Sequence, residues 1–309
     1  MNFFSITVLF LTSTVLHYSI QNLFIRYKKF DHINHRSSHN TIATRTGGIG
    51  IFISSLLISL YFYFNKIDLF DYSLFIPFGI MFIIGVYDDF YDAHFRLKFF
   101  IQIIVAKILI DQGYIISNYY GLFGINEIPW FTAQLTTIFV FLIVVNAINF
   151  IDGIDGLAIT EVIKAILLIE FFSEKGTHLS IFSVIIITSL VPLYYFNFKK
   201  NKKIFLGDGG SMLLGTIIMV YILTILNDNY IFKNNFHLNK TLFSVIVIFY
   251  PLLDLLRVFI IRISEGKSPF LADQNHLHHI LFKKGFNSIY NLITIQIISI
   301  LIFLLIISF

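Results

Sequence analysis

The sequence predicts an all-α polytopic membrane protein with about ten transmembrane helices. Of its 309 residues, 57% are hydrophobic and only 13% are charged, whereas soluble domains carry roughly 25% charged residues. The mean hydropathy is +0.81. Apolar runs of about 17–25 residues, the length that crosses a bilayer, recur along the whole chain. We therefore expect one integral membrane domain over residues 1–309.

Ten apolar runs follow one another with polar connections between them. The first has no positively charged segment before it and no small-residue cleavage site, so we expect a retained helix and not a signal peptide. Cysteine is absent, which excludes disulfides and thiolate metal sites. The expected spans are 3–25, 47–64, 73–87, 99–112, 131–149, 157–172, 179–196, 211–226, 242–263 and 289–309.

Lysine and arginine are divided unequally between alternate loops. Because cytoplasmic loops carry an excess of these residues, the richer set is predicted to be cytoplasmic and both termini to lie outside. This topology explains the net charge of +4 better than binding to nucleic acid does. The richer set is Arg26, Lys28, Lys29, Arg36, Arg45, Arg96, Lys98, Lys199, Lys200, Lys202, Lys203, Arg257, Arg262, Lys267, Lys283 and Lys284, and the poorer set is Lys66, Lys175, Lys233 and Lys240.

Residues 146–158 bring two amides and two carboxylates together at the end of an apolar run. Asn146 and Asn149 are three residues apart, as are Asp152 and Asp155, so each pair shares a face if the helix continues through them. Polar groups at the mouth of a membrane helix are costly and indicate a functional site. The alternative is an interfacial turn with solvated carboxylates.

Two further groups of carboxylates fall on the predicted cytoplasmic side. Asp88 and Asp92 are four residues apart and would share a helix face, with Asp89 beside them. Clustered carboxylates repel unless a cation or a basic partner neutralises them. Asp208 lies among glycines at the start of an expected helix, where a phosphate would be welcome and a carboxylate could hold its Mg²⁺. A plain N-cap is the alternative.

Basic and imidazole groups complete the candidate site. Arg45 precedes Gly47-Gly48, and an arginine beside glycine amides suits phosphate. Lys107 and Asp254 lie inside apolar runs, where ionisable groups usually face the bundle interior. Lys107 either attracts a lipid phosphate or pairs with an acidic neighbour. No HExxH pattern accompanies the histidines, so phosphate or sugar binding is favoured over zinc. These histidines are His276, His278 and His279.

Taken in order, five segments resemble the polyprenyl-phosphate N-acetylhexosamine-1-phosphate transferases, the WecA/MraY type of glycosyltransferase family 4. They are residues 35–48, 88–92, 146–158, 205–211 and 276–279. The resemblance implies about ten helices around a cytoplasm-facing groove in the bacterial inner membrane. It also implies transfer of a sugar phosphate from a UDP-N-acetylhexosamine to undecaprenyl phosphate, with release of UMP, as the first lipid-linked step of a cell-surface polysaccharide. A homodimer is left open.

The resemblance also implies roles for single residues. Asp208 resembles the family's Mg²⁺ ligand, with Asn149 as a second ligand and Mn²⁺ as an alternative ion. Asp88 and Asp89 resemble its essential aspartate pair, and Asp92 is the third position of that segment. The pair could act as base, orienting group or nucleophile. The expected substrate-binding residues are Arg45, Lys107, Asp152, Asp155, Phe205 (stacking on uracil), His276, His278 and His279.

The chain departs from the family in its first loop, where Ile42 and Thr44 replace two prolines. Relatives that act on muramyl-pentapeptide often carry lysine where this chain has Asp92, which favours the branch that initiates O-antigen or teichoic acid. A phospho-MurNAc-pentapeptide transferase is nevertheless an alternative. A prenyltransferase with an Asp-rich segment is a more distant alternative, because it leaves the segments at 207–211 and 276–279 unexplained. A transporter is also distant, because its acidic residues should lie near the bilayer midplane in repeated, broken helices, whereas most of them here fall at one face.

Overall fold

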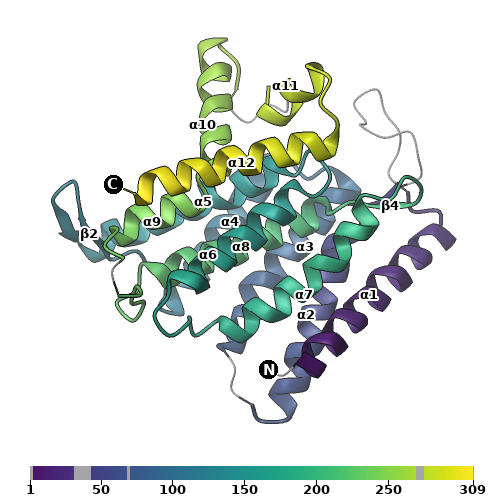
Figure 1. Ribbon diagram of the computed structural model, residues 1–309, viewed down its shortest axis with the longest axis horizontal. Coiled ribbons are helices and arrows are strands. Elements are labelled where there is room, and N and C mark those ends of the chain that lie inside the picture. Colours follow the sequence, from purple (N-terminus) through teal and green to yellow (C-terminus); the bar gives the residue numbers. More distant parts are fainter. Residues whose placement is uncertain (1–2, 31–42, 68–69, 235, 269–274, 309) are drawn as a thin grey trace. The chain divides into compact units, whose positions relative to one another are not determined.

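The structure, a computed structural model, describes residues 3–30, 43–67, 70–234, 236–268 and 275–308. This part is almost entirely helical (Figure 1), which confirms the predicted fold class. The chain divides into two compact units, Met1–Ala93 with His178–Leu213 and His94–Thr177 with Leu214–Phe309. The single domain over residues 1–309 stays a prediction.

The first unit consists of long helices and one short pair of strands. Its elements are α1 (Phe3–Arg26), β1 (Ala43–Thr44), α2 (Gly47–Phe64), the 3-10 helix η1 (Tyr72–Leu74), α3 (Phe75–Tyr91), α7 (Ser180–Asn197), β4 (Lys203–Ile204) and the first turns of α8 (Gly207–Ile225). Helices α1, α2 and α7 pack against one another (Figure 1). Strands β1 and β4 pair in parallel, with Thr44 opposite Ile204, and so bring the starts of α2 and α8 together.

The second unit contains the remaining helices and a β-hairpin. Its elements are α4 (Phe95–Asp111), β2 (Asn118–Leu122), β3 (Ile125–Glu127), α5 (Trp130–Ile151), α6 (Leu157–Phe172), the rest of α8, α9 (Lys240–Val247), α10 (Phe249–Ser264), α11 (Leu277–Lys283) and α12 (Ser288–Ile307). Helix α5 packs against both α4 and α10. The hairpin holds the start of α9, because Asn239 Nδ2 donates to the Tyr120 carbonyl at 2.6 Å and Thr241 Oγ1 to the Tyr119 carbonyl at 2.9 Å.

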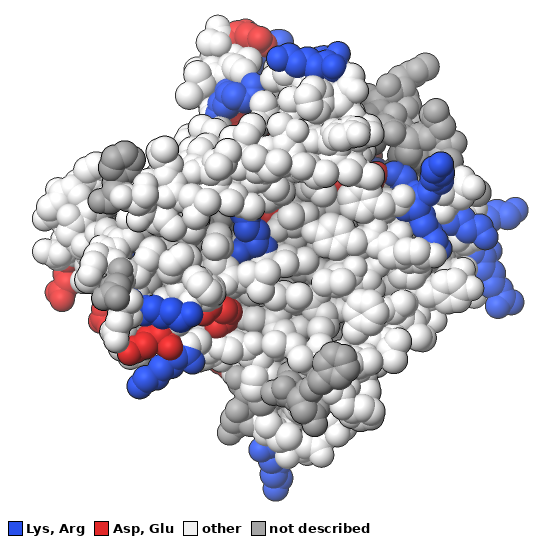
Figure 2. Space-filling view, viewed as in Figure 1, with Lys and Arg blue, Asp and Glu red and all other residues white. Residues whose placement is uncertain are grey.

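The helices confirm a multi-pass membrane protein. Seven of them, α1, α2, α3, α5, α7, α8 and α12, are long and apolar enough to cross a membrane within the described part of the chain, and the bent α9–α10 pair would add an eighth. Helices α4 and α6 have only 17 and 16 residues. All ten predicted apolar runs form helix, but the count of ten spans stays a prediction. Figure 2 shows that uncharged residues form most of one face.

The predicted continuous span at 242–263 is wrong. Two helices occupy it, α9 and α10, and they meet at an angle of 75°. Pro251 accounts for the break, because a proline within a helix has no N–H to donate and its ring collides with the carbonyl four residues earlier. That carbonyl belongs to Val247, where α9 ends.

Candidate active site

In the first unit, Asp89 fixes the start of the helix that carries Asp208. Its two carboxylate oxygens accept hydrogen bonds from the backbone N–H groups of Asp208 and Gly209, each at 3.0 Å. These amides belong to the first turn of α8 and have no acceptor within the helix. The Asp89 side chain is 5% exposed, and Arg45 Nη1 lies 3.5 Å from its Oδ1. Asp89 thus acts as an N-cap for α8 from 119 residues away.

The starts of α2 and α8 meet through their backbones. The N–H groups of Gly47 and Gly48 donate to the carbonyls of Phe205 and Leu206, both at 2.9 Å. A Cβ on Gly48 would lie 2.2 Å from the backbone nitrogen of Gly210, so only glycine permits this contact. The two amides that the sequence offered to phosphate are therefore used by the fold. That expectation was wrong for these donors.

The other two carboxylates of the Asp88–Asp92 segment lie in different surroundings. Asp88 is buried, and its Oδ1 accepts a hydrogen bond from the Ala93 N–H at 2.8 Å. Helix α3 ends at Tyr91, and Asp92 follows it in the left-handed conformation with φ of 50°. The predicted shared helix face is wrong, because this reversal turns Asp92 out of the helix. Asp88 and Asp89 are the two carboxylates that remain on α3.

The surroundings of Asp89 and Asp208 suit a hard cation. The negative charge of Asp208 acts on the buried Asp89, and neighbouring carboxylates repel unless positive charge offsets them. The Arg45 side chain is 41% exposed, so solvent weakens what it supplies. Mg²⁺ commonly uses one or two carboxylates and completes its shell with water and substrate phosphates. Among the described residues, no cluster of three His, Asp or Glu side chains could hold a metal alone, which is compatible with that mode of binding.

In the second unit, α5 ends within the segment that the sequence singled out. The helix stops at Ile151, so Asn149 is helical while Asp152 and Asp155 lie in the turn before α6. The expected pairing of the two carboxylates on a helix face is therefore wrong. Asn146 is tied within the unit, since its Nδ2 donates to Gln102 Oε1 at 2.9 Å. This leaves Asn149, Asp152 and Asp155 as the candidates of this segment.

The histidines pack against that turn. A Cβ on Gly153 would lie 2.2 Å from Nε2 of His278, so the imidazole rests directly on the glycine backbone. Among the described residues, neither ring nitrogen of the buried His278 has a hydrogen-bond partner. Burial, with help from its neighbours His279 and His276, lowers the pKa of His278 from 6.5 to about 3. The ring is uncharged at neutral pH and offers a donor and an acceptor to a ligand.

Asp254 holds the histidine segment in place, a role that the sequence did not reveal. It is a buried residue of α10, and its carboxylate accepts from His276 Nδ1 at 2.7 Å, the Leu277 N–H at 2.8 Å and Arg257 Nη2 at 3.2 Å. Arg257 also donates to the Asn275 carbonyl. The expectation that Asp254 faces the interior is confirmed. Its partners His276 and Leu277 lie 22 and 23 residues away, beyond the reach of local pattern analysis.

Two expected substrate-binding residues have different settings. Lys107 forms an ion pair with Asp111 one helical turn along α4. Of its two predicted roles, the structure therefore shows the pairing with an acidic neighbour. Phe205 lies between β4 and α8 with its ring half-buried, and its N–H donates to the Thr44 carbonyl at 2.8 Å. Substrate contacts for both stay predictions. Residues 35–42 of the first predicted segment lie outside the described residues.

The candidate residues fall into two sets, one in each unit. The first unit contains Arg45, Asp88, Asp89, Asp92, Phe205 and Asp208, and the second contains Lys107, Asn149, Asp152, Asp155, His276, His278 and His279. Asp208 and Asn149 thus belong to different units, and their joint binding of a metal stays a prediction.

A multi-pass helical membrane protein with buried carboxylates and a neutral buried imidazole near its helix ends has the features of a membrane-embedded enzyme. Residues 72–226, just over half of the chain, match glycosyl transferase family 4. The chain belongs to this family and is a transferase.

Relatives from several bacteria support the assignment. The chain is 26% identical over 293 residues to an undecaprenyl-phosphate alpha-N-acetylglucosaminyl 1-phosphate transferase of Escherichia coli (strain K12), covering 91% of this chain and 76% of the relative. The Yersinia pestis protein of the same name is 24% identical with the same coverage. A probable undecaprenyl-phosphate N-acetylglucosaminyl 1-phosphate transferase of Bacillus subtilis (strain 168) is 28% identical, covering 94% and 79%.

Proposed function

We propose that the protein transfers N-acetylhexosamine-1-phosphate from a UDP-sugar to undecaprenyl phosphate. An oxygen of the lipid phosphate attacks the β-phosphorus of the donor, the bond from that phosphorus to the bridging oxygen breaks, and UMP leaves. The names of the relatives support the acceptor and favour N-acetylglucosamine as the sugar. The structural observation that carries the proposal is Asp208 at the start of α8, where its own N–H and that of Gly209 each donate a hydrogen bond to Asp89.

Mg²⁺ is the proposed cofactor, with Asp208 as its principal protein ligand and Asn149 as a second one. When bound, the ion would offset the negative charge that develops on the phosphates. Asp89 contributes by fixing the backbone of Asp208. Arg45, whose guanidinium reaches solvent beyond its contact with Asp89, is the proposed phosphate-binding arginine, since its donors match phosphate oxygens.

The proposed roles of the remaining carboxylates do not require proton transfer. The second pKa of a phosphate monoester is about 6, so the acceptor is mostly a dianion at neutral pH. A general base would therefore add little. Asp88 is proposed to orient the acceptor or its cation. The neutral His278 ring is proposed to hydrogen-bond the donor sugar or phosphate, and Asp152 and Asp155 are proposed to frame the nucleotide.

The proposed location is the bacterial inner membrane, with the active site on the cytoplasmic side and both termini outside. Sixteen Lys and Arg residues in one set of loops against four in the other support this orientation. A cysteine introduced at Tyr63 or at Lys199 tests it. Because the chain has no cysteine of its own, a membrane-impermeant maleimide applied to intact cells should label only the variant at Tyr63.

The function is tested with purified protein, undecaprenyl phosphate and a panel of UDP-sugars. UMP and the lipid product should form in equal amounts, only with a divalent cation, and stop on chelation. Asp208→Asn should lower the rate by at least about 100-fold, because even the loss of a residue that only supports a metal ligand commonly costs about 10- to 100-fold. Release of inorganic diphosphate from a prenyl diphosphate would favour the prenyltransferase. Absence of product from every UDP-sugar would overturn the proposal.

A further inference from the structure

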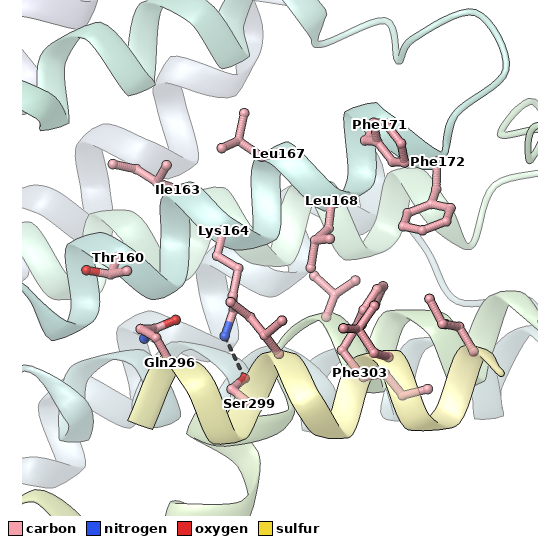
Figure 3. Close-up of a pocket in the computed structure, with 15 residues that line it drawn as sticks. Thr160, Ile163, Lys164, Leu167, Leu168, Phe171, Phe172, Gln296, Ser299 and Phe303 are labelled. Carbon is pink, nitrogen blue, oxygen red and sulfur yellow. Dashed lines mark hydrogen bonds between the residues drawn. The ribbon is translucent and has the colours of Figure 1, made fainter. Parts of the chain in front are cut away.

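A cavity lies in the second unit, and none of the candidate residues of that unit lines it. It has a volume of about 550 Å³ and is lined by α6, the end of α9 and α12 (Figure 3). Ligand sites of this size are typically apolar, with a few polar groups that fix the orientation of the ligand. This cavity fits that description, and none of its lining residues has a role in the proposed transfer of a sugar phosphate.

Three polar residues of the cavity lining, Lys164, Gln296 and Ser299, are connected through the buried Glu161. Lys164 Nζ donates to Glu161 Oε2 and to Ser299 Oγ, both at 2.7 Å, as Figure 3 shows for Ser299. Gln296 Nε2 donates to the other Glu161 oxygen at 2.7 Å. Both oxygens of the buried Glu161 are therefore satisfied. An ionised pair within a membrane helix is costly and usually functional.

Within the described part of the chain, Lys164 retains one donor for a ligand. An ammonium group has three N–H bonds, and two of them are used by Glu161 and Ser299. The side chain is 13% exposed and lines the cavity. Because Glu161 neutralises its charge, the remaining N–H suits a neutral acceptor, such as an ester carbonyl, at least as well as an anion.

The rest of the cavity is hydrocarbon over a defined length. From Lys164 to Phe172 the lining follows α6 for ~12 Å at 1.5 Å per residue, somewhat less than the ~15 Å thickness of one leaflet's hydrocarbon. The cavity volume of about 550 Å³ lies within the range of ~300–1,000 Å³ that is usual for small-ligand sites, and its apolar lining suits a single hydrocarbon chain.

We infer that this cavity binds one acyl chain of a membrane phospholipid, whose ester oxygen accepts a hydrogen bond from Lys164. The chain lies along Leu168, Phe172 and Phe303, and the lipid joins α6 to α12 as a structural ligand. The inference does not depend on the proposed transfer reaction.

The test measures phospholipid retained by the full-length protein. Protein is reconstituted in vesicles of phosphatidylethanolamine and phosphatidylglycerol, extracted in mild detergent and weighed by native mass spectrometry. Leu304→Trp fills the cavity, whereas Leu301→Trp on the same helix is the matched control. Leu304 lines the cavity and Leu301 does not, and the two are similarly exposed, at 51% and 59%.

We expect one retained phospholipid in the unaltered protein and in Leu301→Trp, and about tenfold weaker retention, or ~1.4 kcal/mol, in Leu304→Trp. The double change Glu161→Gln with Lys164→Met removes the donor without leaving a buried charge and should have a similar effect. Equal retention by the two tryptophan variants would overturn the inference. So would a retained polyprenyl phosphate, or a dimer that only Leu304→Trp dissociates. A failed transfer assay would leave this result untouched.

Discussion

Replacing Asp89 with asparagine should release the first turn of α8. The carboxylate accepts two backbone hydrogen bonds, from Asp208 and Gly209, and its side chain is only 5% exposed. Hydrogen bonds to a buried charged acceptor contribute ~1.5–3 kcal/mol each. An asparagine side chain can accept only one of these two hydrogen bonds, through its carbonyl oxygen. Its NH₂ group would face the second backbone N–H, which then has no acceptor. The expected local loss is about 3 kcal/mol, which opens this turn on the order of 100-fold more often.

Hydrogen–deuterium exchange at residues 207–211 measures this opening directly. The amides of Asp208 and Gly209 should exchange on the order of 100-fold faster in Asp89→Asn. Asp92→Asn is the matched control, because Asp92 lies three residues along the chain in an exposed left-handed position. Its exchange profile at α8 should equal that of the unaltered protein.

The transfer assay then tests whether Asp89 acts by positioning Asp208 or by contacting substrate or metal itself. If Asp89 acts by holding Asp208, the Asp89→Asn enzyme should require more Mg²⁺ for half-maximal rate and should recover part of its activity at high Mg²⁺. An Asp89→Asn protein with normal exchange at Asp208 but no activity at any Mg²⁺ concentration would refute the capping role. Asp89 would then contact substrate or metal itself.

Three further predictions concern the histidine segment. Asp254→Asn should loosen His276, speed amide exchange at 276–279 by at least about tenfold and raise KM for the UDP-sugar more than it lowers kcat. Gly153→Ala places a Cβ 2.2 Å from His278, so the ring must move and donor KM should rise severalfold while the unfolding temperature changes little. His278 stays neutral down to about pH 3 in the folded protein, whereas the unfolded chain binds a proton below pH 6.5. The free energy of unfolding should therefore fall by up to ~1.4 kcal/mol per pH unit from pH 6.5 toward 3, and His278→Phe should lose that slope in detergent melts.

The helices could be predicted because their signal is local. Each apolar run is long and is followed by polar residues, and every one of the ten forms helix. The break between α9 and α10 also has a local cause, because Pro251 cannot continue a helix from Val247, although the sequence analysis predicted a continuous span. The ends of α3 and α5 were not. Asp92 and Asp152 could have extended those helices, and only the packed structure shows that they do not.

The residues of the candidate site could be predicted more readily than their partners. Asp89 and Asp208 were both recognised as candidates. The hydrogen bonds that Asp89 accepts from Asp208 and Gly209, however, join positions 119 and 120 residues apart. Asp254 was recognised as an interior carboxylate, yet its contact with His276 depends on how α10 meets α11. Local spacing contains no information on such contacts. Residue chemistry therefore predicts which residues are candidates for the site, whereas tertiary packing determines which other groups hold them in place.

The hydrogen bonds at the helix starts narrow the ways in which this enzyme can balance phosphate charge. Backbone amides that suggested anion binding, those of Gly47, Gly48 and Asp208, already serve carbonyls or Asp89. The ring of His278 is uncharged at neutral pH, so it can orient a phosphate but cannot neutralise one. Arg45 is the arginine that we propose to bind phosphate, and the proposed substrates, a donor diphosphate and a lipid phosphate, carry more negative charge than one arginine offsets. A divalent cation on Asp208 is the further positive charge that we propose, so dependence on Mg²⁺ is the sharpest test of the proposed function.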